Sequence, residues 1–90
     1  MTKVYGYVEN DLYLIDSIDN INYKLLIEYQ YGIDKDCIAY KELKSGSYRD
    51  CILSLYGLMT SYILRGGKDT YRANMILDEL NKEIEKIKAV

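Results

Sequence analysis

Apolar and polar side chains alternate most regularly between Ile21 and Tyr31. Every odd position in this segment is apolar or aromatic, and every even position except Leu26 is polar. A period of two places successive side chains on opposite faces of a strand, so the segment predicts a half-buried strand with one buried and one polar face. A helix would distribute the same residues around its whole circumference.

Three further strands are predicted on either side of this segment. Lys3–Val8 and Leu12–Asp16 flank residues 9–11, a turn whose Asn and Asp tolerate the left-handed backbone conformation, which indicates a hairpin. The pattern of Cys37–Leu43 fits either a strand or a short helix. We favour a strand because Ser45-Gly46 interrupts the chain shortly afterwards.

The second half of the chain has the three-to-four-residue spacing of amphipathic helices. Ser47 followed by Asp50 forms a capping-box pattern, and the helix that it begins extends to about Leu64. The glycines at residues 66–67 end this helix, and a second helix runs towards Ile87. The predicted core positions of the two helices are Ile52, Leu55, Met59, Tyr62, Ile63, Ala73, Ile76, Leu77, Leu80, Ile84 and Ile87.

These elements predict an α+β fold, in which an antiparallel sheet of three or four strands is followed by an αα-hairpin packed on one face. The 90 residues form a single domain, strand-rich over residues 1–44 and helical over residues 47–88. Gly57 inside the first helix costs about 1 kcal/mol relative to alanine, so it predicts a close approach of another backbone.

Composition restricts the chemistry that the chain can perform. It has no histidine, which excludes a Ser-His-Asp triad, a Cys-His pair and a His-ligated metal site. Carboxylate pairs such as Asp34 and Asp36 are explained by the turns that they form. Cys51 is in line with Leu55 and is expected to be a buried, inert thiol. We therefore expect no enzymatic activity, no catalytic residue, no cofactor and no metal site.

The first residues, MTKVYGYVENDLYL, contain no apolar segment of the kind that a signal peptide requires. We therefore expect a cytoplasmic protein whose two cysteines stay reduced. The longest nearly charge-free stretch, residues 51–64, is shorter than the ~20 apolar residues of a membrane span, so no membrane association is expected.

Tyrosine is unusually frequent in this chain. There are 11 tyrosines and no phenylalanine or tryptophan. A core of this size does not hold all of these rings, and surplus tyrosine at a surface is typical of protein-recognition sites. The competing explanation is tyrosine in place of phenylalanine in the core. Leu26, together with Ile38 and Tyr40 if their segment is a strand, would lie on the sheet face that the helices leave uncovered.

Charge is unevenly distributed along the chain. Residues 1–36 hold seven acids and three bases, a net charge of −4, and residues 37–90 hold seven acids and nine bases, a net charge of +2. An acidic hairpin that carries tyrosines would complement a basic surface such as a nucleic-acid-binding groove, although ordinary solubilising charge explains the same pattern. We predict a protein-binding module that docks on a larger cytoplasmic protein. The predicted contact residues are Tyr5, Tyr7, Glu9, Asp11, Tyr13, Asp16, Asp19 and Tyr40.

Small acidic single domains of this kind resemble, in general style, the phage or mobile-element proteins that inhibit host defence machinery, which implies an inhibitor that docks on a functional surface. A nucleic-acid or nucleotide-phosphate binder is the alternative, because the loop at residues 65–70 combines two glycines with basic residues before a helix. An ordinary turn between helices explains the same loop. A homodimer is a third hypothesis. The alternative contact residues are Lys41, Lys44, Arg49, Arg65, Lys68, Tyr71 and Arg72.

Overall fold

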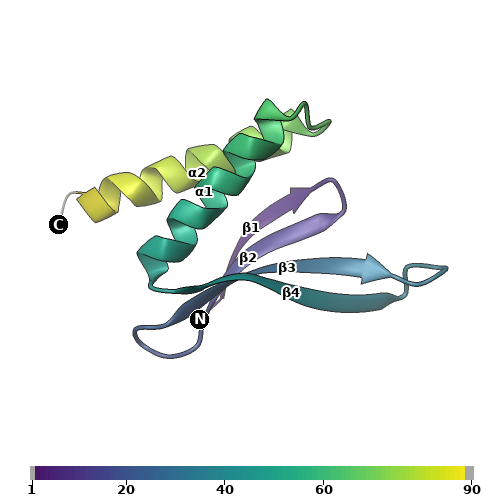
Figure 1. The fold of residues 1–90 in the computed structure, drawn as a ribbon, viewed down its shortest axis with the longest axis horizontal. Helices are drawn as coiled ribbons and strands as arrows, with labels where there is room; N and C mark the ends of the chain where they lie inside the picture. Colours follow the sequence, from purple (N-terminus) through teal and green to yellow (C-terminus); the bar gives the residue numbers. More distant parts are fainter. Residues whose placement is uncertain (1, 89–90) are drawn as a thin grey trace.

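Four strands and then two helices follow one another along the chain (Figure 1). The computed structural model describes residues 2–88. The elements are β1 (Thr2–Val8), β2 (Asp11–Ser17), β3 (Tyr23–Tyr31), β4 (Cys37–Gly46), α1 (Tyr48–Leu64) and α2 (Thr70–Lys88). The predicted α+β fold is confirmed, with four strands in the sheet, and the segment whose pattern fitted either a strand or a helix is a strand.

Each strand pairs in antiparallel orientation with its neighbour in the sequence, in the order β1-β2-β3-β4. Ile15 lies opposite Leu25, and Leu14 lies opposite Leu26. Because successive side chains point to opposite faces, the first pair is directed towards the helices and the second pair away from them. We call the side without helices the open face. Its apolar and aromatic residues are Val4, Tyr7, Leu12, Leu14, Leu26, Ile38 and Tyr40.

The two helices form an antiparallel hairpin on the other face of the sheet (Figure 1). The Ser47 hydroxyl accepts a hydrogen bond from the Asp50 amide at 3.1 Å, and the Asp50 carboxylate accepts one from the Ser47 amide at 3.3 Å. This reciprocal pair confirms the predicted capping box at the start of α1. From there α1 contacts β3 and β4, whereas α2 contacts β1.

One hydrophobic core fills the space between the helices and the sheet. Nearly all of the core positions predicted for the two helices reach this core. Tyr62, Ile63, Leu77 and Ile84 pack around the fully buried residues. Of the predicted positions, only Ile87 lies outside that cluster. Burying each large aliphatic side chain contributes about 1.5–3 kcal/mol. The buried members are Val8, Ile15, Leu25, Cys51, Ile52, Leu55, Met59, Ala73, Ile76 and Leu80.

The distal half of the β3–β4 hairpin, residues 27–41, extends beyond the helices, and we call it the arm (Figure 1). The strand predicted for residues 21–31 was expected to bury one face over its whole length. Of the odd-numbered residues that form this face, only Leu25 is fully buried, and Tyr29 and Tyr31 are 36% and 52% exposed. Ile21 precedes the strand, which begins at Tyr23. The burial prediction is therefore wrong for the distal half, because α1 diverges from β3 beyond Leu25.

One prediction about a turn and one about a glycine are also wrong. The left-handed residue of the β1–β2 turn is Glu9, with φ 57°, whereas Asn and Asp were predicted to take that conformation. The Glu9 amide donates to the Asp69 carboxylate at 3.3 Å, which ties this turn to the start of α2. A Cβ placed on Gly57 would meet no heavy atom within 4 Å, so no described backbone approaches it closely.

An ion pair joins the first strand to the last helix. The Lys3 ammonium lies 2.8 Å from a Glu83 carboxylate oxygen and 3.7 Å from one of Glu79. It also lies 5.4 Å from the centroid of the Tyr5 ring, whose hydroxyl is 3.5 Å from that of Tyr48. Hydrogen bonding to Lys3 lowers the pKa of Glu83, and the same bond raises the pKa of Lys3.

This ion pair makes stability depend on pH in the acidic range. A carboxyl group with a lowered pKa in the folded state stabilises the protein above its unfolded pKa, here 4.5, and loses that contribution as pH falls through the folded pKa. We expect Glu83→Gln to remove about 1 kcal/mol of unfolding free energy at pH 7 and very little at pH 2. Denaturant titrations across this pH range measure the difference. Glu79→Gln, which removes the longer and more exposed contact, is the matched control and should change stability little at either pH.

Candidate protein-interaction surface

The two cysteines differ in their surroundings, and neither they nor the carboxylates of residues 2–88 form a metal-binding group. Cys51 is fully buried, and burial raises the pKa of its thiol, so it remains protonated as expected of an inert core residue. Both cysteines are free thiols, and Cys37 lies on the arm. No group of three or more Cys, Asp or Glu residues in residues 2–88 is arranged to hold a metal ion.

The α1–α2 loop uses its backbone amides internally. The Tyr62 hydroxyl accepts a hydrogen bond from the Asp69 amide at 2.8 Å, and the Asp69 carboxylate accepts one from the Arg72 amide at 3.3 Å. Gly66 has φ +81°, and its amide donates to the Ile63 carbonyl, as in a glycine cap. A carboxylate of this chain therefore already occupies the helix N-terminus where a phosphate would bind.

The structure separates the basic residues of the alternative site. Arg65, Lys68 and Arg72 gather near the α1–α2 loop together with Tyr71, which is 75% exposed. Arg49 lies at the opposite end of α1, on the order of 24 Å away at the rise of an α-helix. The remaining two, Lys41 and Lys44, are exposed residues of the edge strand β4.

The tyrosines divide into two groups of similar size. Six of the eleven are half-buried and pack around the core. The other five are exposed, so the surplus predicted from composition is present on the surface. The half-buried group is Tyr5, Tyr13, Tyr23, Tyr48, Tyr56 and Tyr62, and the exposed group is Tyr7, Tyr29, Tyr31, Tyr40 and Tyr71.

The predicted contact residues do not all lie on one surface. Tyr5 and Tyr13 pack against the core on the helical side, and burial raises the pKa of both hydroxyls. Tyr7, Asp16 and Tyr40 lie on the open face, according to their register with β2 and β3. The other three are in or beside turns: Glu9 is in the β1–β2 turn, Asp11 follows it at the start of β2, and Asp19 is in the β2–β3 turn.

Asp19 has a local role in the β2–β3 turn. Its carboxylate accepts hydrogen bonds from the backbone amides of Ile21 and Asn22, both at 2.8 Å, and from the Asn22 side chain at 2.9 Å. The bond from the Asn22 side chain, followed by the two backbone bonds, lowers the pKa of Asp19. This carboxylate therefore shapes the turn, as short polar side chains commonly do.

The open face has an apolar centre. Leu14 is only 7% exposed although no helix covers it, because Val4 and Leu26 lie opposite it on the neighbouring strands. A shallow depression of about 380 Å³ lies beside it. Its lining residues are Thr2, Leu14, Asp16, Lys24, Leu26 and Tyr40.

Carboxylates border this apolar centre. The Tyr40 hydroxyl donates a hydrogen bond to Glu28 at 2.6 Å, which raises the pKa of Tyr40. The Thr2 hydroxyl donates one to Asp16 at 2.7 Å. Glu42 lies opposite Leu26, so a third carboxylate belongs to the same face. These hydrogen bonds fix the orientation of exposed side chains. In the described part of this face the three carboxylates outnumber the base Lys24.

Sequence reasoning found part of this surface. It placed Leu26, Ile38 and Tyr40 on the uncovered side, but it did not select Val4 or Leu14. A signal was present in the sequence, because Leu12–Ile15 is apolar on both alternating faces, which indicates a strand covered on more than one side.

Comparisons with known proteins give no family for this chain. No protein-family model, no curated protein and no solved structure matches it. Within residues 2–88, neither helix combines the length and the apolar character that a membrane crossing demands.

Proposed function

We propose that this chain is a non-enzymatic protein-binding module that docks on a larger protein through its open face. The observation that carries the proposal is the apolar centre around Leu14, on a sheet face that no described element covers. A sheet face that meets only water is ordinarily polar at alternate positions. Contiguous apolar surface bordered by polar groups is typical of interaction sites.

The charge of the open face supports a basic partner. Asp16, Glu28 and Glu42 lie on it together with a single base, Lys24. Complementary charge accelerates association and disfavours acidic partners. A nucleic-acid-binding groove has the required basic character. Covering such a groove would exclude its nucleic acid, which is how a phage or mobile-element inhibitor of a host defence protein would act.

Variants at matched exposed positions test this proposal. A partner captured from a lysate and identified by mass spectrometry is purified and titrated against wild type, Leu26→Asp and Tyr40→Ala. We expect both variants to weaken binding at least tenfold, because truncated anchor residues commonly lose that much. Tyr71→Ala removes another exposed tyrosine, on α2, and should bind like wild type. Equal affinity of all four proteins would overturn the proposal.

The alternative, a nucleic-acid binder, is supported by the clustering of Arg65, Lys68, Tyr71 and Arg72 near one loop. It predicts the opposite pattern in a gel-shift titration with labelled duplex and single-stranded DNA. Tyr71→Ala and Arg72→Ala would weaken binding there, and the affinity of wild type would fall steeply with salt. A DNA complex of this kind, unaffected by Leu26→Asp, would replace the docking proposal.

A further inference from the structure

Helix α1 is unusually free of charge for a helix at the surface. No charged residue occurs between Asp50 and Arg65, and the next helix in the chain, α2, carries charges along its exposed side. The exposed side of a surface helix normally carries charged and polar residues. Here only one side of α1 enters the core, and Leu53, Leu58 and Leu64 are 47%, 37% and 81% exposed.

An open cleft lies between this uncharged side of α1 and the sheet. It has a volume of about 420 Å³, and Leu25 and Leu43 of the sheet line it. On the α1 side the lining residues are Ser54, Gly57, Leu58 and Ser61. A Cβ added to Gly57 would meet no atom within 4 Å beyond the backbone of its own helix, and three of the four α1 residues are small. A second polypeptide can therefore approach the helix closely.

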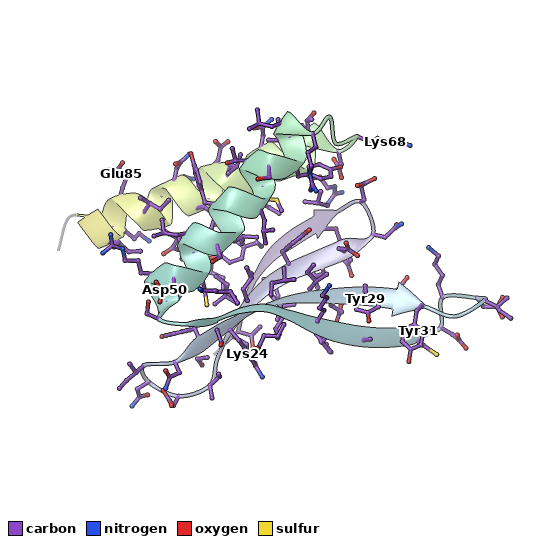
Figure 2. All side chains as sticks on the ribbon, viewed as in Figure 1. Lys24, Tyr29, Tyr31, Asp50, Lys68 and Glu85 are labelled. Carbon is purple, nitrogen blue, oxygen red and sulfur yellow. The ribbon has the colours of Figure 1, made fainter. Side chains whose placement is uncertain are left out.

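The arm presents an apolar row next to this cleft. Ile27, Tyr29 and Tyr31 lie on the same face of β3 as the core residue Leu25. The Tyr29 and Tyr31 rings are neighbours, with centroids 6.3 Å apart. Figure 2 shows both tyrosines on the arm, beyond the region that the helices cover. Lys41, opposite Ile27, is the only charged residue paired with this row.

The molecule also exposes more surface than a monomer of its size requires. Its accessible area is 6181 Å², against roughly 5,400 Å² expected for a globular 10.5-kDa protein. The excess belongs to an elongated molecule of 47 × 31 × 16 Å, and a standard interface buries ~800 Å² of each partner. The radius of gyration, 13.5 Å, likewise exceeds the ~12 Å expected for 90 residues.

We propose that two copies of the chain associate as a symmetric dimer in which the arm of each copy covers the uncharged side of α1 of the other. One molecule carries both apolar surfaces, so a two-fold axis pairs them reciprocally. Neither the apolar row of the arm nor the lining of the cleft contains a carboxylate, and Asp34 and Asp36 belong to the turn at the tip of the arm. Asp16, Glu28 and Glu42, in contrast, would disfavour such pairing through the open face. The dimer uses a different surface from the proposed docking site and does not depend on it.

Sedimentation equilibrium at concentrations from about 1 µM to 1 mM tests the dimer, because this range covers weak and moderate affinities. We expect the wild-type mass to rise from 10.5 kDa towards twice that value. Gly57→Glu places a charge in the cleft, where a Cβ has room, and replaces glycine by a better helix former. It should reduce the association constant at least tenfold and leave the monomer as stable as before or more stable.

Two tyrosine variants on the arm localise the contact. Tyr29→Ser should weaken the dimer at least tenfold, and Tyr40→Ser, on the other face of the same hairpin, should not. A wild-type mass of one chain at every concentration would overturn the proposal. A dimer that persists in both Gly57→Glu and Tyr29→Ser would also overturn it, as would one that only Tyr40→Ser dissociates. Since Gly57→Glu leaves the open face intact, it should still bind the partner of that face, which separates this test from the preceding one.

Discussion

Replacing Leu25 by alanine is expected to lower the free energy of unfolding by about 3 kcal/mol, and the same change at Leu26 by less than about 1 kcal/mol. The two residues are adjacent in β3 and lose the same atoms. Leu25 is fully buried under α1, so its truncation leaves a cavity in the core. Leu26 lies on the open face, where water fills the space that is left.

Urea titrations followed by circular dichroism measure both losses, with an unchanged slope showing that the unfolded states are comparable. The adjacent position is the control for strand propensity, because both variants replace leucine by alanine within one strand. A shift of the register by one residue would exchange the two faces and reverse the order of the losses. Equal losses would contradict the assignment of an uncovered face.

Replacing Gly67 by alanine is expected to destabilise the protein by about 2 kcal/mol. The added Cβ would overlap the ring of Tyr62, which packs across this glycine. The ring has little freedom to move away, because its hydroxyl accepts the hydrogen bond from the Asp69 amide and its edge packs against the core. Displacing it would therefore disturb the loop that begins α2.

A double-mutant cycle separates this steric effect from other consequences of losing a glycine. In a Tyr62→Ala background the obstructing ring is absent, and Gly67→Ala should then cost less than about 0.5 kcal/mol. Thermal unfolding of the four proteins provides the comparison. If Gly67→Ala costs the same in both backgrounds, the contact with Tyr62 does not determine the effect.

The secondary structure was predictable because its signals are local. The alternation around Leu25 requires only that neighbouring side chains point to opposite faces. The capping box at Ser47 and Asp50 lies within four residues, and both of its hydrogen bonds are present. The ambiguous segment from Cys37 was resolved as a strand by pairing with β3, an interaction between separate segments that local pattern does not contain.

The extent of burial was not predictable in the same way. Alternation indicates which side chains share a face, but the length and direction of the covering helix decide which of them are buried. Tyr29 continues the row of Leu25 and is nevertheless exposed, because α1 does not extend over the arm. Gly57 was assigned a close contact because glycine is costly inside a helix, but the neighbouring elements that would make such a contact are not indicated by local sequence.

The sequence indicated which type of residue the candidate site contains, but it indicated less well which individual residues belong to the site. Excess tyrosine correctly indicated exposed rings, and Tyr40 was selected among them. Tyr5 and Tyr13 were selected as well, although they pack beside the core. Their burial depends on where the helices lie on the sheet, which leaves no distinct pattern in the sequence.

The order of the strands bears on how this chain reaches its fold. Every sheet pairing joins segments that are consecutive in the sequence, and the two helices likewise form a hairpin. Short loops lose little entropy on closure, and topologies rich in near-neighbour contacts fold on the order of milliseconds or faster. Lys3 and Glu83 are 80 positions apart, so their ion pair forms only when the two ends of the chain meet. Shortening either end would remove this long-range closure while leaving the rapidly formed hairpins in place.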